Sequence, residues 1–165
     1  MISLIEATTA DLPLIRQIAY KTWPPTYGHI LSSAQLDFML ESFYSDDTLL
    51  KNMTEKGHYF LLLKENEDWM GFASYEHHYN GTNITRLHKL YLLPEAQGKG
   101  AGKQLLEAVE CAARQSHSVA VSLNVNRFNK AKEFYLKCGF EIVGEENLEI
   151  GHGYLMEDYK MEKWF

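Results

Sequence analysis

The segment that most restricts the folds open to this 165-residue chain is Leu90–Leu105, where a predicted strand passes through alternating glycines into an amphipathic helix. The glycines are Gly98, Gly100 and Gly102. Glycines at such a junction let the backbone turn its N–H groups toward one point, and the dipole of the helix favours an anion there. Lys99 and Lys103 add positive charge. The pattern predicts a phosphate or pyrophosphate site, and a tight strand-to-helix turn without a ligand is the alternative.

The spacing of these glycines disfavours two common phosphate-binding motifs. A P-loop needs Ser or Thr directly after Gly-Lys, whereas Gly102-Lys103 is followed by Gln104. A dinucleotide-binding fingerprint reads G-x-G-x-x-G within a parallel βαβ unit, whereas this segment reads G-x-G-x-G after strands that look antiparallel.

Hydrophobic periodicity predicts one mixed α/β domain over residues 1–165. The pattern favours a mostly antiparallel mixed sheet flanked by helices. We expect the first helix to end at Trp23-Pro24-Pro25, because a residue before proline is pushed away from helical angles. The expected strands are 2–7, 59–63, 70–77, 84–93, 118–125, 140–143 and 154–164, and the other expected helices follow Ser32 and Gly102 and cover 46–55 and 129–137.

Composition excludes several classes of protein. With 16 Lys+Arg against 22 Asp+Glu, the net charge of −6 disfavours a nucleic-acid partner, which needs a basic face. No apolar run reaches the length of a membrane span, and the N-terminus lacks the zones of a signal peptide. Cys111 and Cys138 form no disulfide framework, so we expect a cytoplasmic, reduced protein.

Two segments resemble motifs of the GNAT family of N-acetyltransferases. Gln97–Gly102 resembles the family's Q/R-x-x-G-x-G/A pyrophosphate loop. Leu123–Phe140 resembles its next motif, a strand followed by a helix with the pattern F-Y-x-x-x-G-F. The resemblance implies the acetyl-CoA N-acyltransferase-like fold, acetyl-CoA as the donor substrate, and direct transfer to a primary amine of a small molecule or peptide in a ternary complex. A non-catalytic acyl-CoA-binding sensor and an acetyltransferase acting on a protein N-terminus are the alternatives.

The resemblance also assigns the donor-binding residues. The strand before the loop would offer backbone groups to the pantetheine arm, the loop would hold the pyrophosphate, and Asn129 and Lys132 would contact pantetheine and phosphate. The full set is Leu90, Tyr91, Leu92, Gln97, Gly98, Lys99, Gly100, Ala101, Gly102, Lys103, Asn129, Lys132 and Tyr135.

Catalytic roles follow from the same resemblance. Tyr135 matches the tyrosine that protonates the departing thiolate, and a phenol suits that role because it stays un-ionised at neutral pH. The alternative is that Tyr135 only extends an apolar helix face. The acceptor ammonium must lose a proton, and His88 stands near the position of the family's usual glutamate, with Glu76 as the second candidate.

The acceptor side is less constrained by the sequence. Trp23 and Tyr27 either line the acceptor site or belong to the core, and Asp46, Asp47 and Glu76 are candidates to attract a cationic amine. The last strand, 154–164, is a candidate edge for a homodimer. No metal is expected, because His29, His58, His117 and His152 have no ligand-like spacing with cysteines or acids.

Overall fold

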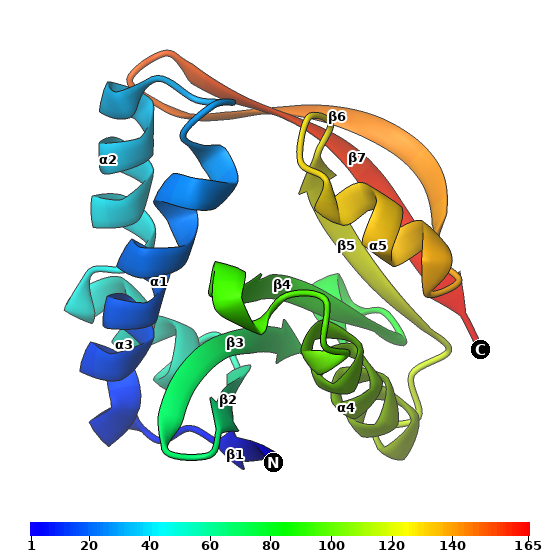
Figure 1. Cartoon of the computed structure of the whole chain (residues 1–165). Helices are drawn as coiled ribbons and strands as arrows, with labels where there is room; N and C mark the ends of the chain where they lie inside the picture. Colours follow the sequence, from blue (N-terminus) through cyan, green and yellow to red (C-terminus); the bar gives the residue numbers. More distant parts are fainter.

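Seven strands form one mixed sheet in the computed structural model, which describes all of residues 1–165 (Figure 1). Their order is β1-β2-β3-β4-β5-β7-β6, and every neighbouring pair is antiparallel except β4 and β5. The strands are β1 (Ile2–Glu6), β2 (His58–Glu65), β3 (Asp68–Glu76), β4 (Ile84–Leu92), β5 (Ala120–Asn126), β6 (Glu141–Gly151) and β7 (Tyr154–Trp164). The predicted α/β architecture with a mostly antiparallel sheet is confirmed.

Helices cover both faces of the sheet and bury a separate apolar cluster on each. On one face, called the α1 face below, lie α1 (Leu12–Tyr27), α2 (Ser33–Phe43) and α3 (Asp46–Thr54). On the other, the α4 face, lie α4 (Ala101–Gln115) and α5 (Ala131–Lys137). Each face has a core cluster of 15 buried residues. Because side chains alternate along each strand, neighbouring residues of the sheet contribute to different clusters.

The prediction that Trp23-Pro24-Pro25 ends the first helix is wrong, because α1 continues through both prolines to Tyr27. Pro24 and Pro25 are exposed, and so are Tyr20 and Lys21, whose carbonyls lose their helical donors to the prolines. Those carbonyls can bind water instead. Burial of the Trp23 and Tyr27 side chains, 2% and 5% exposed, holds this last turn against the sheet.

The parallel strands β4 and β5 stay together over only three residue pairs. The pairs are Ile84 with Ala120, Thr85 with Val121, and Arg86 with Ser122. Beyond Arg86 the two strands diverge, and β4 also contains a bulge at His88, since Tyr75 pairs with Leu87 whereas Ser74 pairs with Lys89. One side of β4 from Leu87 to Leu92 is therefore left without a strand partner, and a cleft opens through the sheet.

The last two strands form a long hairpin that reaches across to α2 (Figure 1). Gln35 Nε2 of α2 donates to the carbonyl of Leu155 at 2.9 Å. β6 is longer than the predicted 140–143, and β7 lies between β5 and β6. The expectation that 154–164 is a free edge is therefore wrong: β6 and β1 are the edges of the sheet. None of the helices combines the length and the apolar run that crossing a membrane requires.

Candidate active site

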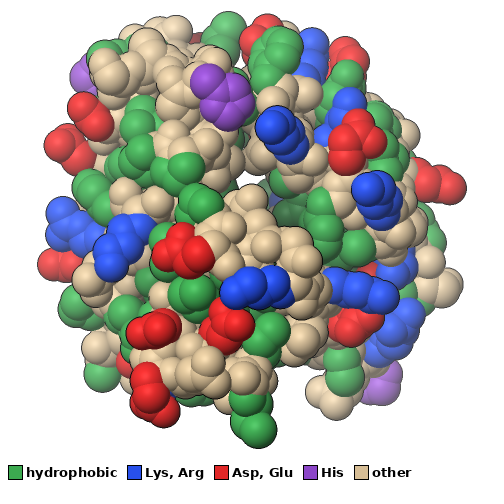
Figure 2. Space-filling model, in the orientation of Figure 1, with side chains coloured by type: hydrophobic (Ala, Val, Ile, Leu, Met, Phe, Trp, Pro, Cys, Tyr) green, Lys and Arg blue, Asp and Glu red, His purple; other side chains and the backbone are tan.

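A cavity of about 700 Å³ lies between the end of α1, the diverging part of β4, the glycine loop and α5. Figure 2 shows the surface hollowed in the middle of this face, between the α1 side and the α5 side. We call this cavity the donor groove. Its lining consists of Pro25, Thr26, His29, Leu90, Tyr91, Leu92, Pro94, Gln97, Gly98, Gly100, Gly102, Lys103, Asn129, Lys130, Ala131 and Phe134. Most of the predicted donor-binding residues thus line one groove.

The glycine loop gives the groove a set of free backbone donors. Gly98 and Gly100 have φ values of 77° and 79°, which residues with a Cβ rarely adopt. No side chain caps α4, and the amide of Gln104 makes the first helical bond, to the carbonyl of Gly100. The preceding N–H groups at the helix start remain available, as an anion-binding helix N-terminus requires.

Three of the predicted donor-binding residues lie elsewhere. Lys99 Nζ is directed to Glu65, 3.5 Å from its Oε2. Ala101 is 3% exposed and belongs to the α4-face core. Lys132 Nζ lies 3.5 Å from Glu133 Oε1 and over the ring of Tyr159. Sequence spacing places these residues near the loop but does not determine where the side chains point.

A smaller cavity of about 40 Å³ continues the donor groove between β4 and β5. It shares Leu90, Tyr91, Asn129 and Ala131 with the groove, and we call it the inner cavity. The rest of its lining is Tyr27, Leu87, His88, Lys89, Leu123, Asn124, Val125 and Tyr135. The two main catalytic candidates, Tyr135 of α5 and His88 of β4, therefore line the same cavity from opposite sides of the cleft.

Tyr135 has the features of a proton donor. Its ring packs against Phe134 and Phe140, and its hydroxyl has no hydrogen-bond partner within the protein. Burial raises the pKa of Tyr135, so the phenol remains protonated at neutral pH. Asn129, which begins the turn before α5, accepts the N–H of Ala131 on its Oδ1 at 2.9 Å, and its side chain also hydrogen-bonds to Tyr27.

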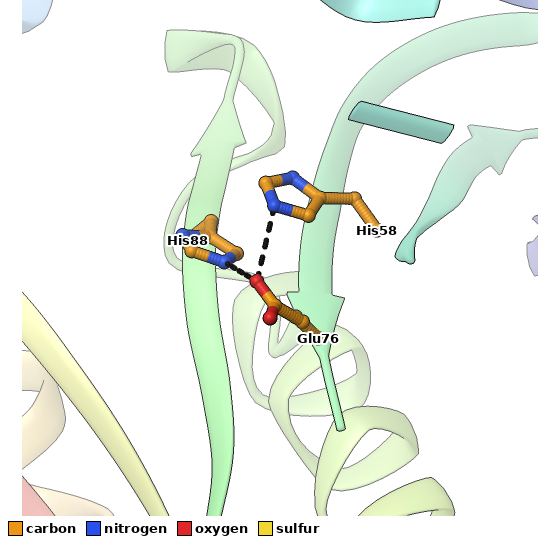
Figure 3. A group of neighbouring side chains, drawn as sticks. All are labelled: His58, Glu76 and His88. Carbon is orange, nitrogen blue, oxygen red and sulfur yellow. Dashed lines mark hydrogen bonds and ion pairs between the residues drawn. The ribbon is translucent and has the colours of Figure 1, made fainter. Parts of the chain in front are cut away.

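Glu76 is held between two histidines on the α1 face (Figure 3). His88 Nε2 lies 3.0 Å and His58 Nε2 3.2 Å from Glu76 Oε1. Burial raises the pKa of Glu76 and lowers that of both histidines, to about 4 for His58, where the cations Lys89 and Lys56 add to the lowering. Both imidazoles are therefore neutral at neutral pH; His88 can donate its Nε2–H to Glu76, and His58 Nε2 lies close to the same oxygen.

Sequence reasoning missed His58. It lies one residue before the strand predicted at 59–63, so its pairing with Glu76 in the β2–β3 register was not visible. The correct register puts His58 opposite Glu76, and alternation along β2 and β3 then directs both side chains to the α1 face. A hairpin register counted back from the Glu65–Asp68 pair would put His58 opposite Tyr75, because a bulge at Leu63/Lys64 shifts the pairing by one residue, so the turn alone does not predict this contact.

His58, Glu76 and His88, called the triad below, have the side-chain types of a metal site, and their donor atoms lie within 4.8 Å of one another. The imidazole rings, however, stack at 4.1 Å with planes only 15° apart. The lone pair of an imidazole nitrogen lies in the plane of its ring. In two stacked, nearly parallel rings the lone pairs therefore point in parallel planes and do not converge on one ion. The arrangement suits hydrogen bonds to Glu76.

The predicted acceptor-side residues separate into two groups. Tyr27 lines the inner cavity, and its hydroxyl lies 3.0 Å from that of Tyr91. Trp23 lies in the core instead, where its Nε1 donates to the hydroxyl of Tyr44 at 3.2 Å, and it lines neither cavity. Asp46 and Asp47 are exposed at the start of α3 and pair with Arg16 and Lys51, so the acidic entrance expected there is not formed.

Comparisons with known proteins agree with this geometry. A model of the acetyltransferase (GNAT) domain matches residues 31–163. The spermidine N(1)-acetyltransferase of Thermoplasma acidophilum is 26% identical over 94% of this chain and 96% of its own length. An uncharacterized N-acetyltransferase of Lactobacillus delbrueckii subsp. lactis is 25% identical over 91% of this chain and 90% of its own. The crystal structure of the PaiA N-acetyltransferase of Thermoplasma acidophilum, in complex with coenzyme A, is similar over 100% of this chain and 99% of its own, with a TM-score of 0.81 and 25% identity.

Proposed function

Since the chain belongs to the GNAT family and is an N-acetyltransferase, we propose that it transfers the acetyl group of acetyl-CoA directly to a primary amine of a small molecule. The observation that carries this proposal is that Tyr135 and His88 open into one inner cavity at the end of the donor groove. A 26% identical relative that is named for acetylating spermidine supports a small amine as the acceptor.

The residues of the groove fit coenzyme A. Residues Leu90–Leu92 lie on the side of β4 that has lost its partner strand, so their free backbone groups can pair with the amides of a pantetheine arm. The N–H groups of the glycine loop can donate hydrogen bonds to a pyrophosphate, and Lys103 supplies a positive charge beside it. When bound, acetyl-CoA supplies the activated thioester, and the protein supplies orientation and proton transfer.

Proton transfer is assigned to groups on both sides of the inner cavity. His88 donates its Nε2–H to Glu76 and keeps Nδ1 free to accept a proton from the acceptor amine, directly or through water. Glu76 then stabilises the imidazolium, and His58 holds Glu76 from its other side. Burial and nearby cations strongly lower the pKa of His88, so Glu76, whose pKa burial raises, is the alternative proton acceptor. Tyr135 holds the proton that the departing sulfur requires.

The test is release of thiol from acetyl-CoA with a panel of polyamines, aminoglycosides, amino acids and short peptides. Turnover with at least one small amine, together with acetylated product by mass spectrometry, is the expected result. Calorimetric binding of acetyl-CoA without turnover on any member would favour the acyl-CoA-binding sensor and overturn the proposal. Preference for a peptide over every small amine would instead indicate an acetyltransferase that acts on protein N-termini.

A further inference from the structure

Two carboxylates lie across the cleft from β4, on the two strands beyond the β5 wall of the inner cavity. They are Asp158 of β7 and Glu146 of β6, which lie directly opposite each other in the antiparallel register. Both face the α1 side, as Met156 and Leu148 do, the next such pair along the hairpin. Their neighbour Asn124 of β5 donates its Nδ2 to Glu146 at 3.0 Å and lines the inner cavity.

One oxygen of Asp158 lacks a partner, although the side chain is hydrogen-bonded by Asn124 and attracted by Arg86 and Arg127. Its residue is 5% exposed, and its Oδ1 is buried with no hydrogen-bond partner. The Oδ1 of Asn124 is also buried and unpartnered. Like charges directly opposite across two strands are destabilising, and an unpaired buried polar group costs free energy. Asn124 Nδ2 is the donor to this group, and the Oδ1 atoms of Asp158 and Asn124 remain as buried acceptors without a protein donor.

Two arginines attract Asp158, but neither forms an ion pair with it, and Arg127 pairs with Glu145 instead. Arg86 of β4 is attracted by Glu146, Asp158 and Glu76, yet it forms no ion pair with any of them. Its guanidinium instead lies over the ring of Tyr79 and donates to Ser122 Oγ at 3.4 Å. The unpartnered Oδ1 of Asp158, beside the Glu146 carboxylate, suits a ligand that brings its own positive charge and N–H donors.

Asp158 lies one cross-strand step beyond the wall of the inner cavity. Asn124, at the wall of the inner cavity, pairs with Lys160 of β7, so Asp158 is its diagonal cross-strand neighbour. Such neighbours lie roughly 7–8 Å apart. An acceptor whose reacting nitrogen lies in the inner cavity near His88 could therefore place a second ammonium, one short alkyl spacer away, between the two carboxylates.

We propose that Asp158 and Glu146, oriented by Asn124, bind the second ammonium group of the acceptor, so that the substrates are diamines or polyamines rather than monoamines. The inference rests on the proposed function and names its substrate class. An ammonium with three N–H donors can satisfy both carboxylates and the unpartnered amide oxygen.

The test compares putrescine and spermidine with n-butylamine, a monoamine of the same chain length as putrescine. Asp158→Asn is expected to lower kcat/KM for the diamine at least tenfold while leaving that for n-butylamine within about twofold. Glu146→Gln is the second variant if Asp158→Asn folds poorly. Glu145→Gln is the matched control, because Glu145 is the adjacent residue on the opposite face of β6, where it pairs with Arg127. Calorimetric titration of spermidine into protein without donor gives a readout independent of catalysis.

The outcomes separate this inference from the proposed function. Absence of acetylation with any of the three amines contradicts the proposed function. Acetylation of n-butylamine as efficient as that of putrescine contradicts the subsite alone. Equal loss for both amines in Asp158→Asn, or a loss in Glu145→Gln as large as that in Glu146→Gln, would also overturn it, because the effect would then be structural or only due to overall charge.

Discussion

Tyr135 combines a buried ring with a hydroxyl that no protein group holds, and among the buried tyrosines only Tyr75 shares this, but Tyr75 lines neither cavity. The hydroxyls of Tyr27 and Tyr91 bond to each other, and that of Tyr44 accepts from Trp23. A structural tyrosine in a core normally has such a partner. The free hydroxyl of Tyr135, opening into the inner cavity, is what a general acid needs before substrate binds.

Replacement of Tyr135 by Phe tests this role because it removes only the hydroxyl. We expect kcat to fall by roughly 10²–10⁴-fold, the usual range for general-acid assistance, with little change in acetyl-CoA affinity. Stopped-flow thiol release and calorimetric titration measure the two quantities. A kcat within about twofold of the wild type, where chemistry limits turnover, would mean that the tyrosine only packs.

Asp158 should make stability depend on pH in a way that its amide variant does not. Burial raises the pKa of Asp158 from 3.8 to about 6. The proton therefore stabilises the folded state fully below about pH 4, and this contribution is lost as the pH rises through 6. Asp158→Asn should be more stable than the wild type at pH 7 by about 1–3 kcal/mol, and the difference should vanish toward pH 4.

Urea unfolding at pH 4, 5, 6 and 7 measures this difference for the protein without ligand. Glu145→Gln, an exposed neighbour, is expected to show no comparable pH-dependent gain. A variant that is less stable than the wild type at pH 7 would show that the Asp158 carboxylate is stabilising in the free protein, contrary to its unpaired geometry.

At the scale of elements, the glycine loop and α4 were predictable because their signal is local. Three glycines mark the loop, and the apolar face that follows them marks α4. The motif around α5 is equally short, so each element is defined within a short window of sequence. β7 was likewise predicted with its observed bounds, 154–164. The donor side of the site depends mainly on these local elements, which explains why most of its predicted residues line one groove.

The features that the sequence did not predict depend on contacts between segments far apart in the chain, and a local sequence pattern does not encode such contacts. α1 continues past its prolines because Trp23 packs against Phe43, Tyr44 and Tyr91. The triad needs the register of three strands, and the position of β7 inside the sheet depends on strand order. Burial of a side chain and the direction of a lysine are likewise set by tertiary packing.

Gly100→Val tests the loop at the start of α4. A Cβ at Gly100 meets no protein atom within 4 Å, so the substitution acts through the positive φ of 79° and through the space left for a ligand. We expect at least a tenfold loss of acetyl-CoA affinity by calorimetry, in a protein that still folds. Gly153→Val is the control, because Gly153 has a similar φ of 76° and equally open surroundings at the tip of the last hairpin, away from the groove. Equal effects of both variants on affinity would contradict the loop assignment.

At the scale of the whole molecule, the cleft divides the sheet into two parts. β1–β4 and β5–β7 are joined directly by only three parallel residue pairs, and each face of the sheet has its own core cluster. The donor groove takes residues from α1 and β4 on one side of the cleft and from α5 on the other. A ligand in this groove therefore contacts both parts and should stabilise them together.

Hydrogen exchange with and without acetyl-CoA tests this coupling. A ligand present at 100 times its Kd adds about 2.7 kcal/mol to the free energy of unfolding, so amides that exchange by global opening should slow by about 100-fold. We expect this slowing in β5 and β7 as well as in β3 and β4, and additional local protection in Leu87–Leu92, whose free side faces the groove, and in the loop 98–103. The Gly100→Val variant, measured at the same concentration, should lose most of both effects. Protection confined to β4 and the loop, with β5 and β7 unchanged, would show that the two parts of the sheet open independently and that the ligand does not bridge them.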